Sequence, residues 1–175
     1  MMKPFFKRFF QILLIGFIAI QFFRPVKNKS KNISKNDITK KYLVPMNIQT
    51  ILKTSCYDCH SNNTTYPWYA EIQPIAWWLN NHIMEGKKEL NFSEFGSYSV
   101  KIQQKKLYDI CGQLKLNQMP LHSYLWIHKN ARIDYGEKYG EIIAWAGKLM
   151  DTIAKISSTN KLYNMFSSDS LTKTK

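Results

Sequence analysis

The sequence has few cysteines and few acidic residues, and each scarcity excludes a class of protein. Its three cysteines are too few and too irregularly spaced for the disulfide framework of a small secreted domain. Its 12 acidic residues stand against 25 basic ones, which gives a formal net charge of +13. It has no nucleophile and base pair, phosphate-binding loop or carboxylate dyad, so hydrolysis and phosphoryl transfer have no support.

The positive charge is concentrated in one stretch, which argues against a nucleic-acid-binding protein. Residues 24–41 carry seven basic side chains against the single acid Asp37, a net charge of +6. Residues 42–175 carry only +4, which is ordinary for a solvated surface. The basic stretch is rich in Lys, Asn and Ser and has no periodicity. We therefore expect a flexible linker over residues 25–42, lying near anionic lipid head groups.

The N-terminus contains an apolar run that predicts a membrane segment over residues 1–24. Residues Phe9–Phe23 are uncharged and almost wholly apolar, and the basic residues Lys3, Lys7 and Arg8 precede them. As a helix these residues extend about 22 Å, against about 30 Å for a hydrocarbon core, so the length suits a signal region or a short anchor. No small-residue cleavage site follows. An uncleaved, single-pass transmembrane anchor is therefore favoured over a cleaved signal and over a buried core helix.

The rest of the chain predicts an all-α domain over residues 43–156 and a polar, disordered tail over 157–175. Apolar residues make up 45% of the sequence, and no stretch alternates as a half-buried strand does. Asn47 is a candidate N-cap, Gly86 a candidate left-handed helix stop, and Asp134 with Glu137 resembles a capping box. The predicted helices are residues 48–57, 75–85, one from a cap at Ser97 or Ser99 to 116, and a last one that begins near Glu137. The residues of the last helix that we expect to face inward are Tyr139, Ile142, Ile143, Ala146, Leu149 and Ile153.

The motif Cys56-Tyr57-Asp58-Cys59-His60 carries the predicted chemistry. Two thiols three positions apart can form thioethers to the two vinyl groups of one haem, and His60 is then placed to bind the iron as the proximal axial ligand. A zinc site would need two more ligands at similar spacing, and a thioredoxin-like pair would need a βαβ context. Neither context is present. Cys111 stands alone within an apolar-periodic stretch, which predicts a buried, inert thiol. The sequence therefore predicts one covalently attached haem c.

A sixth iron ligand must come from elsewhere in the chain. Met119 precedes Pro120, which ends any helix and biases Met119 to an extended backbone, so its thioether can project from a loop. We therefore favour Met119 as the distal ligand, with a gap-filling core methionine as the alternative. The remaining candidates are His82, His122, His128 and Met84.

Aromatic residues cluster on both sides of these ligands and predict the walls of a haem pocket. An apolar shell keeps water from the iron and tunes its potential, although a small domain needs the same residues for an ordinary core. The candidate wall residues are Trp68, Trp77, Tyr124 and Trp126.

The order of several motifs resembles the bacterial haem-binding domain proteins, a cytochrome c-like family, over about residues 43–148. The segments that carry the resemblance are 51–62 around the cysteine motif, 66–69 (Tyr-Pro-Trp-Tyr), 89–94 (Glu-Leu-Asn-Phe-Ser-Glu), 119–121 (Met-Pro-Leu), His128 and 143–145 (Ile-Ala-Trp). Phe95 departs from the Trp that members often carry there. The resemblance implies a periplasmic, often membrane-tethered domain with a single haem.

Two functions follow from a predicted haem. With His60 and Met119 as axial ligands, the closed coordination shell suits electron transfer with a redox partner protein rather than enzymatic turnover. An open or displaceable distal site would instead suit a peroxidase or a sensor of small gases, with a histidine as the distal acid or base. The positive-inside rule favours a cytoplasmic domain, because the flank after the apolar run is the more basic one. We nevertheless predict the periplasmic side, because covalent haem attachment in bacteria takes place outside the cytoplasm.

Overall fold

The chain folds as an all-α protein, which confirms the helical part of the predicted fold class. The computed structural model describes residues 4–133 and 135–172, and within these ranges it contains no strand beyond the isolated bridge between Lys29 and Asn63. Residue contacts divide the chain into two compact units. Unit 1 comprises Met1–Asn32 and Tyr57–Asn91, and unit 2 comprises Ile33–Cys56 and Phe92–Lys175.

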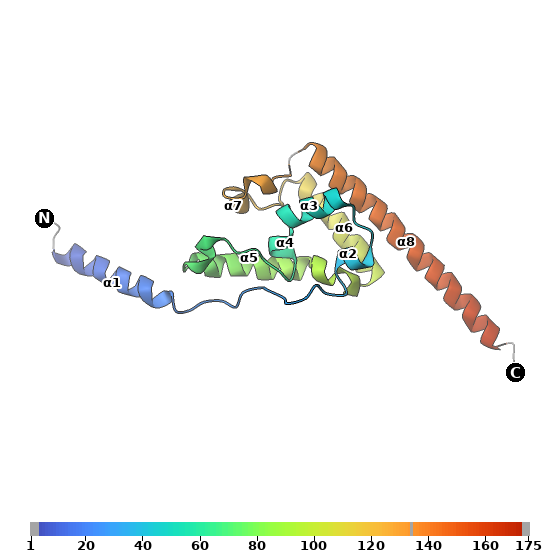
Figure 1. Cartoon of the computed structure of the whole chain (residues 1–175), viewed down its shortest axis with the longest axis horizontal. Helices are drawn as coiled ribbons and strands as arrows, with labels where there is room; N and C mark the ends of the chain where they lie inside the picture. The colour runs from blue at the N-terminus through green and yellow to red at the C-terminus, as the bar shows by residue number, and fades with distance from the viewer. Residues whose placement is uncertain (1–3, 134, 173–175) are drawn as a thin grey trace. The chain divides into compact units, whose positions relative to one another are not determined.

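Unit 1 is organised around helix α5, Ile75–Glu89. The one-turn helix α4, Tyr57–His60, and the 3-10 helix η1, Trp68–Glu71, both contact α5 (Figure 1). Ala76 and Ile83 supply the buried apolar positions of α5. Helix α4 carries most of the cysteine motif, so α5 is the element against which the motif is placed.

Helix α1, Pro4–Ile20, opens unit 1 with side chains that are exposed along most of its length. It carries Lys7 and Arg8 near its start and no acidic residue in its first turn. Across the described ranges, no helix has both the length and the apolar character needed to cross a membrane, which leaves the predicted transmembrane helix without support.

Residues 21–30, which we call the N-terminal strap, follow a defined path along α5. The Trp77 indole N–H donates to the Phe23 carbonyl at 2.7 Å, and the Lys87 ammonium donates to Asn28 Oδ1 at 2.7 Å. From Phe23 to Asn28 the extended strap covers about 17 Å, and from Trp77 to Lys87 the helix covers about 15 Å. The strap and α5 therefore have matching lengths between these two contacts. Composition predicts a flexible linker here, and the structure differs because the polar side chains have partners within unit 1.

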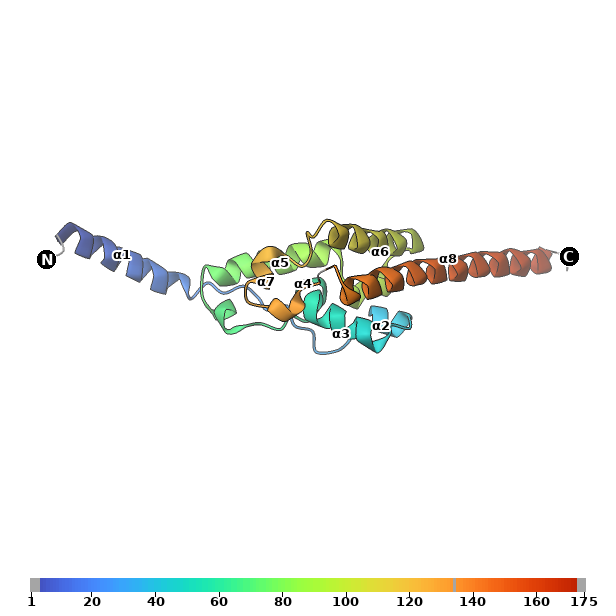
Figure 2. The ribbon, with the colours of Figure 1, turned by 90° about the horizontal axis from the view of Figure 1, so that it is seen from above.

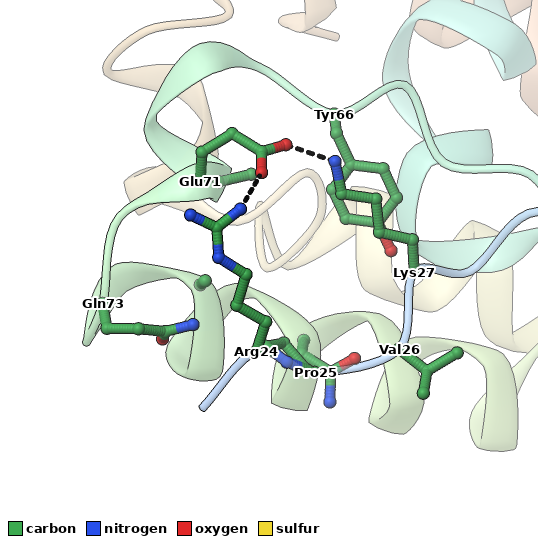
Figure 3. Close-up of a pocket in the computed structure, with 10 residues that line it drawn as sticks. Arg24, Pro25, Val26, Lys27, Tyr66, Glu71 and Gln73 are labelled. Atoms are coloured by element: carbon green, nitrogen blue, oxygen red, sulfur yellow. Dashed lines mark hydrogen bonds and ion pairs between the residues drawn. The ribbon is translucent and has the colours of Figure 1, made fainter. Parts of the chain in front are cut away.

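The first part of the strap is tied to η1 and to Gln73, which lies two residues before α5. The Glu71 carboxylate pairs with Arg24 at 3.2 Å and also accepts from Lys27, whose ammonium lies 5.5 Å from the centre of the Tyr66 ring (Figure 3). The Gln73 N–H donates to the Gln21 side chain at 2.9 Å. Residues 24–27 of the strap line a small pocket together with residues of η1 and α5.

Unit 2 packs several helices around one apolar core. Helix α6, Val100–Lys115, lies beside α8, Glu137–Thr172, and α3, Met46–Ser55, contacts α8 as well (Figure 2). The shorter elements are α2 (Ile38–Lys41), η2 (Phe92–Ser97), α7 (His122–Leu125) and η3 (Lys129–Ala131). The buried core residues include Leu52, Phe95, Leu107, Ile142, Ala146, Leu149 and Ile153. The inward positions predicted for the last helix are confirmed for these four residues of α8, whereas Tyr139 and Ile143 are only half-buried.

Three predicted helix ends differ from those in the structure. Helix α3 begins at Met46 after Pro45, and the Asn47 side chain donates to Glu141 at 2.9 Å instead of capping the helix. Helix α5 continues three residues past Gly86. Helix α8 runs on to Thr172, across the segment that composition predicts as a disordered tail from residue 157. Asp134, the expected start of the last capping box, lies outside the described residues.

The core of unit 2 gives a direct test of the packing. Leu107 is fully buried in α6, so Leu107→Ala leaves a cavity and should lower the free energy of unfolding by about 2–5 kcal/mol. Tyr108 is its neighbour in α6 and is 70% exposed, so Tyr108→Ala should change that free energy by about 0.5 kcal/mol or less. Chemical denaturation followed by circular dichroism measures both, and equal losses would contradict the helix register.

Candidate functional site

The cysteine motif begins at the end of α3 and continues into the separate turn α4. Cys56 is the C-cap of α3, with its N–H donating to the Leu52 carbonyl at 2.9 Å. Cys59 and His60 follow in α4, and both cysteines are half-buried. No disulfide links any of the cysteines in the described ranges, so both thiols of the motif are reduced. The predicted single helix running from 48 to 57 is therefore broken at Cys56.

The His60 ring is fixed through one of its two nitrogens. Nδ1 lies 2.8 Å from the Gly86 carbonyl oxygen and 3.0 Å from the Leu90 carbonyl oxygen. Carbonyl oxygens only accept hydrogen bonds, so Nδ1 must carry the proton and donate it to both. In the neutral imidazole the lone pair is then on Nε2. This is the tautomer in which histidine binds a metal through Nε2, with the second nitrogen held by the protein.

Gly86 has a different role from the helix stop predicted for it. Its backbone is helical, and a Cβ atom at this position would lie 2.9 Å from the Cys59 carbonyl oxygen and 3.1 Å from Cys59 Cβ. A contact of this kind to a backbone atom cannot be relieved by a side-chain rotation. Glycine at position 86 therefore lets α5 approach α4 closely enough for its carbonyl oxygen to accept from His60.

The loop after His60 folds back onto the motif. The Thr64 hydroxyl donates to the Asp58 carbonyl at 2.6 Å, and the Thr65 N–H donates to the Asp58 carboxylate at 2.9 Å. Ser61 is buried, and its hydroxyl donates to the Asn63 carbonyl at 3.0 Å. Asp58, at one of the two variable positions of the motif, therefore organises the loop that follows the histidine.

Burial changes the acidity of the motif thiol in α4. Desolvation, with a smaller effect from the negative charge of Asp58, raises the pKa of Cys59 to about 11. Burial also raises the pKa of the isolated thiol Cys111, which is half-buried in α6. Both groups are therefore protonated thiols at neutral pH.

The predicted distal ligand follows a well-defined helix end. Helix α6 closes with Asn117 in the left-handed region at φ 53°, where the Gln118 N–H donates to Gln113 and the Asn117 N–H donates to Leu114. These two bonds form a Schellman motif, which turns the chain out of the helix. Met119 comes two residues later and is half-buried in unit 2. Its role as a ligand stays a prediction.

The alternative ligands lie in different surroundings. His82 Nδ1 donates to the Trp78 carbonyl at 2.8 Å, and the His82 ring lies 4.4 Å from the Trp78 ring in α5. His128 stacks on Tyr124 at 4.2 Å in unit 2, whereas His122 and Met84 are exposed. Each of these histidines except His122 thus has an aromatic neighbour that accounts for its position.

The predicted pocket residues are mostly accessible side chains. Trp68 is 77% exposed and Trp126 is 78% exposed, while Trp77 is tied to the strap through its indole N–H. Tyr124 is half-buried beneath His128. Large exposed aromatic surfaces are available for an apolar ligand, but the wall assignment itself stays a prediction.

The donor set of the motif fits a haem better than a bare metal ion. In residues 4–133 and 135–172, no three His, Cys, Asp or Glu side chains come together as a metal site, so the zinc alternative gains no support. His60 is in the tautomer for Nε2 ligation, and the two cysteines that precede it form no disulfide.

The fold and the motif define an all-helical protein that prepares one histidine, next to paired thiols, for ligation. The sequence matches the model of the haem-binding domain family over residues 15–148, and the chain belongs to this family. The family supports haem as the cofactor and confirms the resemblance found in the sequence. No curated protein and no solved structure matches the chain.

Sequence reasoning found the motif but missed the residues that hold it. The Gly86 and Leu90 carbonyls act through backbone atoms, which no side-chain pattern reveals. The one available signal was a glycine inside a helical pattern, which is costly and often has a packing reason. Asn28 also contacts the loop after His60, and nothing in the polar stretch around it marks it out.

The close approach at Gly86 predicts opposite effects for two glycine substitutions. Gly86→Ala should destabilise the chain by about 1–3 kcal/mol, because the added methyl meets the Cys59 backbone. Gly112→Ala in α6 should be neutral or stabilise it by up to about 1 kcal/mol, because nothing lies within 4 Å and alanine favours a helix. Thermal unfolding of both variants measures the difference, and a stabilised Gly86→Ala variant would rule out the contact.

The raised pKa of Cys59 predicts slow alkylation of the haem-free chain. In a Cys56→Ser, Cys111→Ser background, the rate of reaction with iodoacetamide should rise with a midpoint near pH 11. In concentrated urea the midpoint should return to about 8.5, the value of a solvated cysteine. A folded-state midpoint at or below the unfolded one would show that Cys59 is not desolvated.

Proposed function

We propose that this chain is a single-haem, c-type electron-transfer protein of the cell envelope. In this proposal Cys56 and Cys59 hold the haem by thioether bonds, His60 Nε2 binds the iron, and Met119 is the opposite axial ligand. The bound iron supplies one-electron redox chemistry. The chain's own residues hold the imidazole, keep water away and fix the loop that follows the motif.

The observation that carries the proposal is the fixed tautomer of His60. Nδ1 donates to the Gly86 and Leu90 carbonyls, so the lone pair is on Nε2, one residue after a reduced thiol. A second-shell hydrogen bond of this kind orients an axial imidazole and raises its basicity. The spacing of two cysteines and a histidine is specific for covalent haem attachment. Together with membership of the haem-binding domain family, these features favour haem c over a loosely bound haem.

Met119 supports electron transfer over catalysis. A loop methionine after a Schellman turn, half-buried and preceding Pro120, has the freedom to present its thioether sulfur. Methionine and histidine ligation raises the reduction potential and leaves no open iron position for a substrate. The exposed tryptophans Trp68 and Trp126 give the surface apolar contact area for a weakly bound redox partner.

The proposed location is the periplasmic side of the cell membrane. Helix α1 exposes apolar side chains around its length and has two cations near its start, features of an export signal and of a helix that associates with lipid. Covalent haem attachment requires the extracytoplasmic compartment in bacteria.

The test is expression with a cytochrome c maturation system, followed by mass and absorption measurements. The denatured wild-type polypeptide should retain the mass of one haem, and the folded protein should have a six-coordinate, low-spin spectrum. Met119→Ala should become high-spin, because the iron loses an axial ligand. Met84→Ala, which removes an exposed methionine of α5, should leave the spectrum unchanged.

Three results would contradict parts of the proposal. Loss of the porphyrin on denaturation would reject covalent attachment through Cys56 and Cys59. An unchanged low-spin spectrum in Met119→Ala would replace Met119 by a histidine, with His82, His122 and His128 as the candidates. A high-spin wild-type spectrum that binds carbon monoxide readily would favour the peroxidase or gas-sensor alternative over electron transfer.

A further inference from the structure

Two residues of the N-terminal strap hydrogen-bond to the loop that follows the haem motif, Asn28 and Ser30. The Ser30 N–H donates to Asn63 Oδ1 at 2.9 Å, whereas Asn28 contacts both this loop and α5. The Asn28 side-chain amide donates to the Ser61 carbonyl at 2.9 Å and to the Thr64 hydroxyl at 2.9 Å. Its side-chain oxygen accepts from Lys87 at 2.7 Å. Its backbone N–H donates to the Tyr66 hydroxyl at 2.7 Å, and its carbonyl accepts from the Thr64 N–H at 3.0 Å. All the polar groups of Asn28 are therefore in use.

The partners of Asn28 lie on the two elements that flank the His60 ring. Ser61 directly follows His60 and begins the loop that returns to Asp58 through Thr64. Lys87 directly follows Gly86, whose carbonyl accepts from His60 Nδ1. One side chain thus joins the loop that carries the imidazole to the helix turn that fixes it.

The charged contacts of the strap cannot hold the motif loop against the last turn of α5 as Asn28 does. The Arg24 and Glu71 side chains are 59% and 44% exposed, and such pairs contribute little because water and salt screen them. They also lie at the η1 end of the strap, as Figure 3 shows, whereas Asn28 is part-buried beside the motif loop. Partly buried hydrogen bonds that share one residue are costly to lose, because each removal leaves a donor or acceptor without its partner.

We propose that Asn28 is a positioning residue for the axial imidazole, so that the strap sets the orientation of His60. The inference rests on the proposed function for His60 as iron ligand, but the geometry it concerns exists in the haem-free chain. Without Asn28 the loop from Ser61 to Thr64 separates from the C-terminal turn of α5. The hydrogen bonds of His60 Nδ1–H then break more often, and its proton exchanges with water faster.

The first experiment uses the haem-free, full-length chain in detergent micelles. Nitrogen-15 spectra of the histidine side chains report the tautomer of His60 and the exchange rate of its Nδ1 proton with water. In Asn28→Ala that rate should rise roughly tenfold or more, since two side-chain donors and one acceptor are lost beside the ring. Asn32→Ala, an exposed asparagine just past the strap, should leave the rate within about twofold.

Two partial variants keep the test decisive if Asn28→Ala does not fold. Asn28→Asp keeps an acceptor for Lys87 and loses the donors to Ser61 and Thr64, whereas Lys87→Met loses only its own bond. Each should accelerate exchange, by a smaller factor than Asn28→Ala. Wild-type exchange rates in both variants, with Asn28→Ala either unfolded or unchanged, would overturn the proposal and leave Asn28 as a residue of general stability.

A second readout separates this inference from the proposed function. In the haem-loaded protein the reduction potential should shift in Asn28→Ala and Asn28→Asp and stay at the wild-type value in Asn32→Ala and Lys27→Met. An unshifted potential in both Asn28 variants would overturn the inference while leaving haem attachment intact. Failure to attach haem at all would reject the proposed function, and the exchange measurement on the haem-free chain would still decide the role of Asn28.

Discussion

The hydrogen bond from His60 Nδ1 to the last turn of α5 is the constraint on which the rest of unit 1 depends. It requires the Gly86 and Leu90 carbonyls to face the ring, and therefore requires α5 to run three residues past Gly86. It also requires α4 to lie against α5 with no side chain between them, which a glycine at position 86 allows. The Leu90 carbonyl at the helix end, together with the Gly86 carbonyl that also accepts from the Leu90 N–H, thus provides partners for a ring N–H that would otherwise need water or another side chain.

Periodicity and spacing predicted the elements whose signals are local. The apolar positions of α6 and α8 recur at helical intervals, so Leu107, Ile142 and Ile153 could be placed in a core, and the Cys56 to His60 spacing identified the motif. The end of α5 was placed too early because glycine commonly stops helices, and only the neighbouring backbone of Cys59 explains why this one does not. The Asn47 cap was wrong because Glu141, 94 residues away in sequence, attracts its side chain. The domain limits, the distal ligand and the pocket walls stay predictions.

Composition was least informative where polar side chains have specific partners. A Lys, Asn and Ser-rich stretch is typical of a solvated linker, because such residues seldom bury enough apolar surface to order a chain. In residues 21–30 order comes instead from hydrogen bonds that reach 33 to 59 residues along the sequence, from Asn28 to Ser61 and to Lys87. These bonds depend on the fold of α5 and its preceding loop, so no reading of the stretch by itself could have found them.

The path of the strap changes where a shortened form of this protein can begin. A fragment that begins at residue 43, where the composition predicts that the domain starts, would keep every residue of the cysteine motif. By sequence alone it would contain the whole predicted domain. It would nevertheless lack Gln21, Phe23 and Asn28, and so would leave the Gln73 N–H, the Trp77 indole and the Ser61 carbonyl facing solvent. Starting at Gln21 removes the apolar helix α1 and retains all three partners, so a shortened form should begin there rather than at residue 43.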